Sequence, residues 1–455
     1  MNTVHPTASR RAGLFTILVL VISFVGDGGS PHSADLAHQL VLLPILLLFV
    51  ATLWQLLFAS GFGFLSAVWT PRRALFGTIF FELGFVLLFL YECRHFAVQG
   101  YVLHPAITAM FFLAILAALI YLASRPAPRA IWILAVSLAG YIGGLLLAIR
   151  SFPLTYLRSD MMPVILWADT NLLHHIDPYT TMYVGGRVYD FPYLPGMIVA
   201  YLPFTAAHLD LRFDTIACVG ASAALIFWAA RVEHRREVAA LLALFLLSPY
   251  LQYRHELYLS PHWLTLVAAF VLMQRRHFAW AAFVLGIGMG IYQFSWIVLP
   301  FVLLNALRRR GWLEALKLAG FAAVGALLIT GPFLRSASHR IASNTVGQWG
   351  HLAIHAEAEP INLSYWVTYI IHPDKLLRLQ AALMIAIFAY CFLKRRCATL
   401  EDTLRWVVLS LTVFILLNVL VDGYFYLMLL VPMLIYTCVA NHWWSEPEPF
   451  PASIP

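Results

Sequence analysis

The sequence predicts an all-α protein, a polytopic bundle of transmembrane helices with short interfacial helices in its external loops. Of the 455 residues, 62% are hydrophobic and only 11% are charged. A soluble fold could not hide this much apolar surface, so we expect lipid to be the solvent for most of the chain. The apolar residues also fall into runs of roughly the 20 residues that a membrane-spanning helix requires.

Five apolar runs form an expected N-terminal transmembrane unit over residues 1–149. The first, Gly13–Gly26, follows Arg10 and Arg11 as in a signal peptide, but no small-residue cleavage site follows it, so we expect a short span. The other four spans are expected at Val41–Phe64, Leu75–Tyr91, Tyr101–Ala123 and Ala130–Ile149.

The remaining spans are expected within residues 150–440, followed by a cytoplasmic tail at 441–455, for a total of about 14 crossings. They are placed at Phe213–Ala230, Val238–Tyr250, Leu257–Met273, twice within Phe278–Leu307, Leu313–Phe333, Leu376–Leu393, Leu404–Leu420 and Tyr424–Ala440. Tyr193–Ala207 contains Pro195 and Pro203, and we expect it to be re-entrant or interfacial.

Basic clusters set the expected orientation. They recur at Arg72 with Arg73, Arg125 with Arg129, Arg231–Arg236, Arg275–His277, Arg308–Arg310 and Lys394–Arg396. By the positive-inside rule these clusters are cytoplasmic, and the loops 150–193 and 334–375 are external in a multi-pass protein of the plasma (inner) membrane. The basic residues that give the net charge of +7 are therefore explained by membrane topology rather than by nucleic-acid binding. The five cysteines have no metal-ligand spacing.

The external stretch from Arg150 to Pro203 is the longest polar-rich interval in the first half of the chain. Asp160 lies in it where a helix is expected to leave the membrane, so partial desolvation would suit it as a general base. It also precedes an apolar helix with Pro163 in the first turn, which is typical of a helix N-cap. Both interpretations stay open at this point.

The other polar residues of this stretch have structural explanations. Asp177 precedes a proline and is a turn former, while Asp169 is expected to face water from an amphipathic helix at Met161–Leu173. His174 and His175 are adjacent and point in different directions, so they make a poor metal pair by themselves. A metal site would need a third ligand such as Asp160 or Asp190 to converge on one of them, and we assign none.

Three motifs in this stretch resemble the first external loop of the GT-C superfamily, whose members are membrane glycosyltransferases that use polyprenyl-phosphate sugars. They are Ser159-Asp160, then Asn171-Leu-Leu-His-His-Ile-Asp177-Pro178-Tyr179, then Phe191-Pro192-Tyr193-Leu194-Pro195. The pattern is most similar to the mannosyltransferase-like family 87 type. The Gly-rich stretch Leu285–Pro300 and the segment Asp422–Pro432 resemble the same family more weakly, and Tyr292-Gln293 stands where that family often has lysine.

The resemblance implies an inverting hexosyltransferase, with mannose a candidate sugar, that acts on a lipid or glycan acceptor at the external face. By this resemblance, Asp160 corresponds to the catalytic aspartate of that family. The donor, the acceptor and membrane lipid are the expected partners, and no cofactor is required, although a divalent metal ion is a further candidate. The residues expected to bind substrate are Arg158, Asp177, Tyr179, Tyr193, Arg254, His255, Glu256, Arg335 and Arg340.

Phosphate is a good leaving group, so a cation is expected to suffice for its departure. Arg254, Arg335, His339 and Arg340 are the candidates, and interfacial anchoring is the alternative for each. Arg254-His255-Glu256 forms a polar turn between two spans, which either lies near the site or only anchors the helices.

Two other classes of function compete with this one. A transporter or flippase of lipid-linked precursors would carry ionisable residues within its spans, and Glu82 is the main candidate. A glycan polymerase or ligase would use Arg and His of a large external loop rather than an early Asp.

Overall fold

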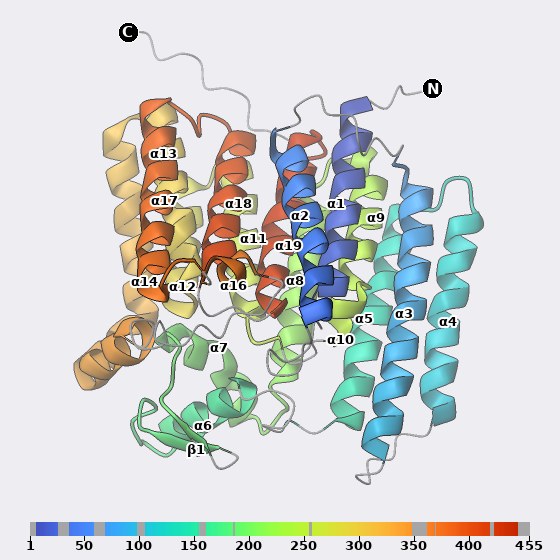
Figure 1. Ribbon diagram of the computed structural model, residues 1–455, viewed down its shortest axis with the longest axis horizontal. Helices are drawn as coiled ribbons and strands as arrows, with labels where there is room; N and C mark the ends of the chain where they lie inside the picture. The colour runs from blue at the N-terminus through green and yellow to red at the C-terminus, as the bar shows by residue number, and fades with distance from the viewer. Residues whose placement is uncertain are drawn as a thin grey trace.

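The computed structural model describes residues 6–25, 36–58, 69–97, 105–152, 154, 161–184, 187–253, 257–347, 362–368, 370–418 and 423–444. Long helices run side by side and alternate in direction, and a small lobe lies at one end of the bundle (Figure 1). The prediction of a helical bundle is therefore confirmed, with a single two-stranded hairpin in the part of the chain described.

The first helices are α1 (Pro6–Val25), α2 (Leu36–Phe58), α3 (Pro71–Ala97), α4 (Pro105–Ser124) and α5 (Ala130–Ser151). The lobe consists of α6 (Met161–Leu173), β1 (Met182–Val184), β2 (Arg187–Tyr189) and α7 (Pro195–Ala206). The two strands pair antiparallel, with Met182 opposite Tyr189.

The chain then returns to the bundle. The helices there are α8 (Arg212–Ala229), η2 (Val232–His234), α9 (Arg235–Leu246), α10 (Pro249–Tyr253), α11 (Ser260–Gln274), α12 (Phe278–Ile291), α13 (Phe294–Arg310), α14 (Trp312–Ile341) and the π-helix η3 (Ala342–Gly347). The last are α16 (Leu363–Thr368), α17 (Pro373–Leu393), α18 (Leu400–Leu417), η4 (Gly423–Tyr426) and α19 (Leu427–Ala440).

Five helices among the described residues are long and apolar enough to cross a membrane. They cover Ile107–Ser124, Ala130–Ser151, Arg212–Ala229, Trp312–Arg335 and Asp374–Leu393. Several other expected spans form shorter apolar helices, so the total of about 14 crossings stays a prediction. The helix α7 has 12 residues and an internal Pro203, and at about 1.5 Å per residue it is too short to cross a bilayer.

The outer helices expose large apolar side chains. Ile107, Met110 and Leu113 of α4 are all more than half exposed, as are Leu327 and Leu328 of α14. Figure 1 places α4 at one edge of the bundle and α14 at the other. Contiguous apolar surface of this kind is unfavourable in water, which indicates that lipid surrounds the bundle.

Arginines of the basic clusters donate hydrogen bonds to backbone carbonyls near the ends of helices. Arg72 Nε donates to the carbonyl of Ala123 at 3.1 Å, and Arg236 Nη2 donates to that of Pro126 at 2.9 Å. Similar bonds join Arg11 to Ala440 and Arg308 to Phe392. The arginines therefore satisfy carbonyls at or just beyond helix ends, in addition to any role in orientation.

The Gly-rich stretch that begins at Leu285 has a packing role. A Cβ atom on Gly286 would lie 2.0 Å from the carbonyl oxygen of Ala322, and one on Gly325 would lie 2.1 Å from that of Phe283. The backbones of α12 and α14 thus approach as closely as small residues allow. Close packing of helices is sufficient to explain the glycines here.

The helix α14 is longer than the expected span. We expected an external loop from Leu334, whereas α14 continues to Ile341. The last two turns carry Arg335, His339 and Arg340, which are exposed. A helix needs apolar residues only where lipid surrounds it, so a polar extension was read from the sequence as a loop.

Candidate functional site

The lobe is built on α6, whose bounds agree with the helix expected at Met161–Leu173. Pro163 lies in its first turn, where a missing N–H costs nothing. Met162, Ile165 and Asp169 form a buried stripe at helical spacing. The chain leaves the helix through His175, which has a positive φ of 59°. This reversal leads to the turn that contains Asp177.

Asp177 makes two contacts. Its Oδ1 accepts a hydrogen bond from the backbone N–H of Tyr179 at 2.9 Å, which is the turn role expected from the sequence. Its Oδ2 lies 2.6 Å from Nη1 of Arg340 near the end of α14. The ion pair joins the two expected external segments, 150–193 and 334–375, and brings together two of the predicted substrate-binding residues.

Tyr179 and Tyr193 form the aromatic core of the lobe. The hydroxyl of Tyr179 donates to the backbone carbonyl of Tyr193 at 3.0 Å. Both rings pack edge-on against Phe191, with centroid distances of 5.3 Å and 5.4 Å. Tyr179 is 1% exposed, so this side chain positions the loop and does not present its hydroxyl at the surface.

Tyr193 also contacts the start of α6. Its hydroxyl group lies against the sulfur of Met161, the residue that follows Asp160 in the sequence. Asp160 and Arg158 lie outside the described residues. The structure therefore places one predicted substrate-binding residue beside the first turn of the helix that Asp160 precedes.

A row of aromatic rings leads from the lobe into the bundle. The ring of Tyr193 lies 5.0 Å from that of Tyr258, and Tyr258 lies 6.5 Å from Tyr292 in the break between α12 and α13. Beyond Tyr292, His262 Nδ1 lies 3.1 Å from Ser295 Oγ. Arg254, His255 and Glu256, which precede Leu257 and Tyr258 in the sequence, lie outside the described residues, as does Asp422.

Asp169 was expected to face water, and this expectation is wrong. Its side chain is fully buried between α6 and α7, and Thr205 Oγ1 donates to Oδ2 at 2.7 Å. The other oxygen, Oδ1, has no hydrogen-bond partner within the described part of the chain. Burial disfavours the charged form and raises the pKa of Asp169 to about 8. Its spacing of four from Ile165 was the signal that places it on the apolar stripe.

The polar end of α14 carries the other predicted cations. Arg335 and His339 are exposed, and neither forms an ion pair with a described residue. Arg340 is about half exposed even though it pairs with Asp177. Arg335 lies about one helical turn before the adjacent residues His339 and Arg340, so the end of this helix gives the lobe a positively charged border.

The described residues contain no group of three His, Cys, Asp or Glu side chains that could hold a metal ion. His174 Nδ1 instead lies 2.8 Å from the carbonyl of Thr170 in the preceding turn. The side chains of Cys218, Cys391, Cys397 and Cys438 are free and buried.

Comparison of the chain with protein-family models, curated proteins and solved structures gives no match. The only ground for assigning the chain to a family is therefore the resemblance of its sequence motifs.

Proposed function

We propose that the protein is a membrane glycosyltransferase that moves a sugar from a polyprenyl-phosphate donor to a lipid or glycan acceptor at the lobe. The observation that supports this most directly is the ion pair between Asp177 and Arg340. It links the segment after α6, where the resemblance lies, to the positively charged end of α14. A donor phosphate requires cations at the site of transfer, and this arrangement supplies them.

Arg340 is suited to hold the departing phosphate. One nitrogen of its guanidinium group contacts Asp177, and the side chain is 52% exposed, so it has further N–H donors for a ligand. Arg335 lies five residues earlier on the same helix. The exposed apolar residues Leu327, Leu328 and Leu334 precede this end of α14 and would keep the polyprenyl tail in lipid.

Asp160 is the proposed base. Among the aspartates of the lobe, Asp169 is buried, Asp177 is paired with Arg340, and Asp190 accepts a bond from Thr181 Oγ1 at 3.0 Å on the hairpin. The resemblance assigns this role to Asp160, which precedes α6 in the sequence.

In the proposed step the acceptor hydroxyl oxygen attacks the anomeric carbon while the bond from that carbon to the phosphate oxygen breaks. The phosphate leaves with the electron pair from the opposite face, near Arg340. The hydroxyl proton passes to Asp160, which later releases it to water. One displacement inverts the configuration at the anomeric carbon.

The direct test uses the full chain in liposomes with radiolabelled polyprenyl-phosphate mannose and, separately, polyprenyl-phosphate glucose, together with a membrane lipid extract as the acceptor. Release of free polyprenyl phosphate with transfer of label to an acceptor supports the proposal. Recovery of intact donors after long incubation with folded protein and the full extract contradicts it.

One observation favours a transporter instead. Glu82 of α3 is fully buried, and it accepts a 3.0 Å bond from Gln252 Nε2 of α10, while its Oε1 has no described partner. A buried carboxyl group within a helix bundle in lipid is a functional candidate by default. Transport would be indicated if the liposomes move a fluorescent polyprenyl-phosphate sugar across the bilayer, do not consume it, and lose this movement with Glu82→Gln.

A further inference from the structure

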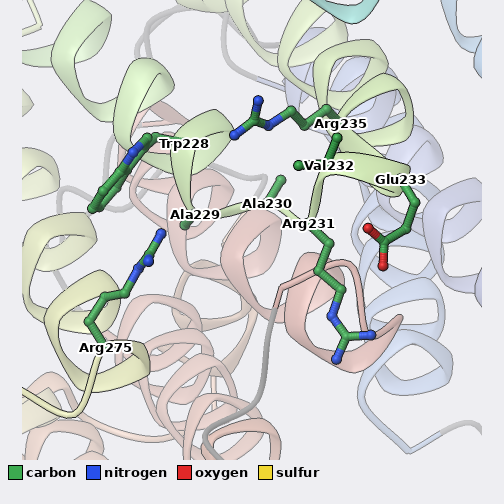
Figure 2. A pocket seen from close by; sticks show the side chains of 8 residues that line it. All are labelled: Trp228, Ala229, Ala230, Arg231, Val232, Glu233, Arg235 and Arg275. Carbon is green, nitrogen blue, oxygen red and sulfur yellow. The ribbon is translucent and has the colours of Figure 1, made fainter.

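A cavity at the end of the bundle away from the lobe has a chemistry that the proposed function does not use. It lies where α8 ends and α9 begins, beside the end of α11, and has a volume of about 480 Å³. Trp228, Ala229, Ala230, Arg231, Val232, Glu233, Arg235 and Arg275 line it (Figure 2). Three arginines against one glutamate make the lining basic.

These three arginines differ from their neighbours at the same end. Arg72, Arg236 and Arg309 each donate a hydrogen bond to a backbone carbonyl. The side chains of Arg231, Arg235 and Arg275, in contrast, bind no carbonyl or carboxylate within the described part of the chain. The Nε atom of Arg235 is buried and has no hydrogen-bond partner there. The arginines that line the cavity therefore have side-chain N–H donors with no acceptor among the described residues.

Aromatic rings hold two of the guanidinium groups in place. Arg275 lies over the ring of Trp228 at 4.2 Å, and Arg235 lies over that of Phe227 at 5.5 Å. Stacking restricts a guanidinium group while its N–H edge stays able to donate. In Figure 2 the side chains of Arg235 and Arg275 extend into the region beside Trp228, and those of Arg231 and Glu233 extend away from it.

The backbone around the cavity is fixed by long-range contacts. Gln274 Nε2 donates to the carbonyl of Ala229 at 3.1 Å, which ties the end of α11 to the end of α8. The N–H of Arg231 donates to the carbonyl of Trp443 at 2.8 Å, and Ala230 forms a bridge with Trp444. The cavity is therefore preorganised by three segments that are distant in sequence.

The position of the cavity relative to the membrane indicates which ligand it binds. Arg212–Ala229 is one of the five candidate spans, so its last residues lie where the hydrocarbon ends and lipid headgroups begin. Trp228 is 52% exposed and Val232 is 75% exposed at the same place. A ligand here can put a phosphate against the arginines and apolar chains against these side chains.

We infer that this cavity binds the phosphate headgroup of one anionic phospholipid, on the membrane face opposite the proposed site of sugar transfer. The arginines supply charge-assisted hydrogen bonds to the phosphate, and Trp228 and Val232 contact the upper part of the acyl chains. The volume lies within the roughly 300–1,000 Å³ that is typical of small-ligand sites.

Native mass spectrometry of the full chain tests this inference. Delipidated protein is titrated with dioleoyl-phosphatidylglycerol, with dioleoyl-phosphatidylcholine, and with inorganic phosphate. We expect one molecule of phosphatidylglycerol to be retained, with much weaker binding of phosphatidylcholine. Displacement of the lipid by millimolar inorganic phosphate would overturn the assignment to a lipid.

Two variants and a matched control locate the site. Arg235→Gln with Arg275→Gln should weaken phosphatidylglycerol binding roughly 10-fold to 30-fold, because each arginine near the surface contributes about 1 kcal/mol. Val232→Glu should weaken it as well, since it adds negative charge at an exposed rim position and keeps every arginine. Arg395→Gln with Arg396→Gln removes equal charge from exposed positions outside the cavity and should leave binding unchanged.

Equal losses in the cavity pair and the control pair would show diffuse attraction and overturn the inference. Unchanged binding in both the cavity pair and Val232→Glu would overturn it too. Each variant is compared with the wild type for monodisperse elution before titration.

Discussion

Asp177 and Arg340 are separated by 163 positions in the sequence, yet Oδ2 of one lies 2.6 Å from Nη1 of the other. The carboxylate also closes its own turn through the N–H of Tyr179. A single side chain thus shapes the loop after α6 and fixes the loop to α14. Loss of the whole Asp177 side chain would therefore remove both contacts.

A double-mutant cycle separates these two roles. Asp177→Asn keeps the turn bond but loses the ion pair, and Arg340→Gln loses the pair from the other side. The pair is partly exposed, so we expect each change to alter stability by only about 0–1 kcal/mol. The rate of sugar transfer should fall by more than this small change in stability explains, because the donor phosphate loses a positioned cation. Thermal inactivation and donor consumption are measured for both single variants and the double variant.

The effects on transfer should be less than additive, since the double variant loses the same ion pair only once. Fully additive effects would show that the two residues contribute separately, and the argument from the ion pair would fail.

Asp169 should make the stability of the lobe depend on pH. Its pKa is about 8 in the fold, against an ordinary value of 3.8, so between these pH values the folded protein holds a proton that the unfolded chain releases. The stability that this group contributes is therefore greatest below about pH 4 and falls as pH rises toward about 8.

Asp169→Asn should remove this dependence and raise the thermal inactivation midpoint at pH 9, because Asn keeps the size and has no charge to bury. Asp190→Asn, at an exposed position of the hairpin, is the control. Both proteins are measured in detergent at pH 5 and pH 9. If the midpoint changes between these pH values by the same amount in the wild type as in Asp169→Asn, the carboxyl of Asp169 is not buried.

The contact between α12 and α14 predicts unequal effects of two glycine substitutions. Gly286→Ala puts a Cβ 2.0 Å from a backbone oxygen, whereas Gly320→Ala in α14 meets nothing within 4 Å. The first should destabilise the protein by about 1–3 kcal/mol, and the second should be neutral or stabilising by up to about 1 kcal/mol. Thermal inactivation in detergent measures both, and equal midpoints would contradict the close approach of the helices.

The orientation of the molecule has its own test. Ser338, near the end of α14, and Ser124, at the end of α4 beside the basic clusters, are both exposed. We expect an impermeant thiol reagent to label Ser338→Cys in intact cells and Ser124→Cys only after the membrane is opened. The opposite pattern would invert the topology and remove the basis for an external donor site. The wild-type chain, which retains Cys93, is the labelling control, and Cys218, Cys391, Cys397 and Cys438 are buried.

Local patterns predicted the elements of this protein better than its long-range contacts. The bounds of α6 followed from Pro163 and the apolar spacing, which are local. Burial of Asp169 was missed because its partner Thr205 lies 36 residues away, and sequence periodicity does not identify partners. The polar end of α14 was read as a loop for lack of apolar residues, although lipid does not surround every turn of a helix.

In the candidate site, too, single residues were predictable from the sequence and their contacts were not. Asp177, Tyr179, Tyr193 and Arg340 were each selected from the sequence. Their pairing across two distant segments depends on the tertiary fold, and nothing local to either segment encodes it.

The central claim is that Asp160 is the base of a sugar transfer, and the most direct measurement is the rate of donor consumption by Asp160→Asn. Asn caps a helix as well as Asp does but cannot accept the proton, so transfer should fall by roughly 100-fold or more while donor binding persists. Asp190→Asn, whose side chain can still accept the bond from Thr181, should retain the wild-type rate. Near-normal transfer by Asp160→Asn at matched protein levels would contradict the account and leave Asp160 as a helix cap.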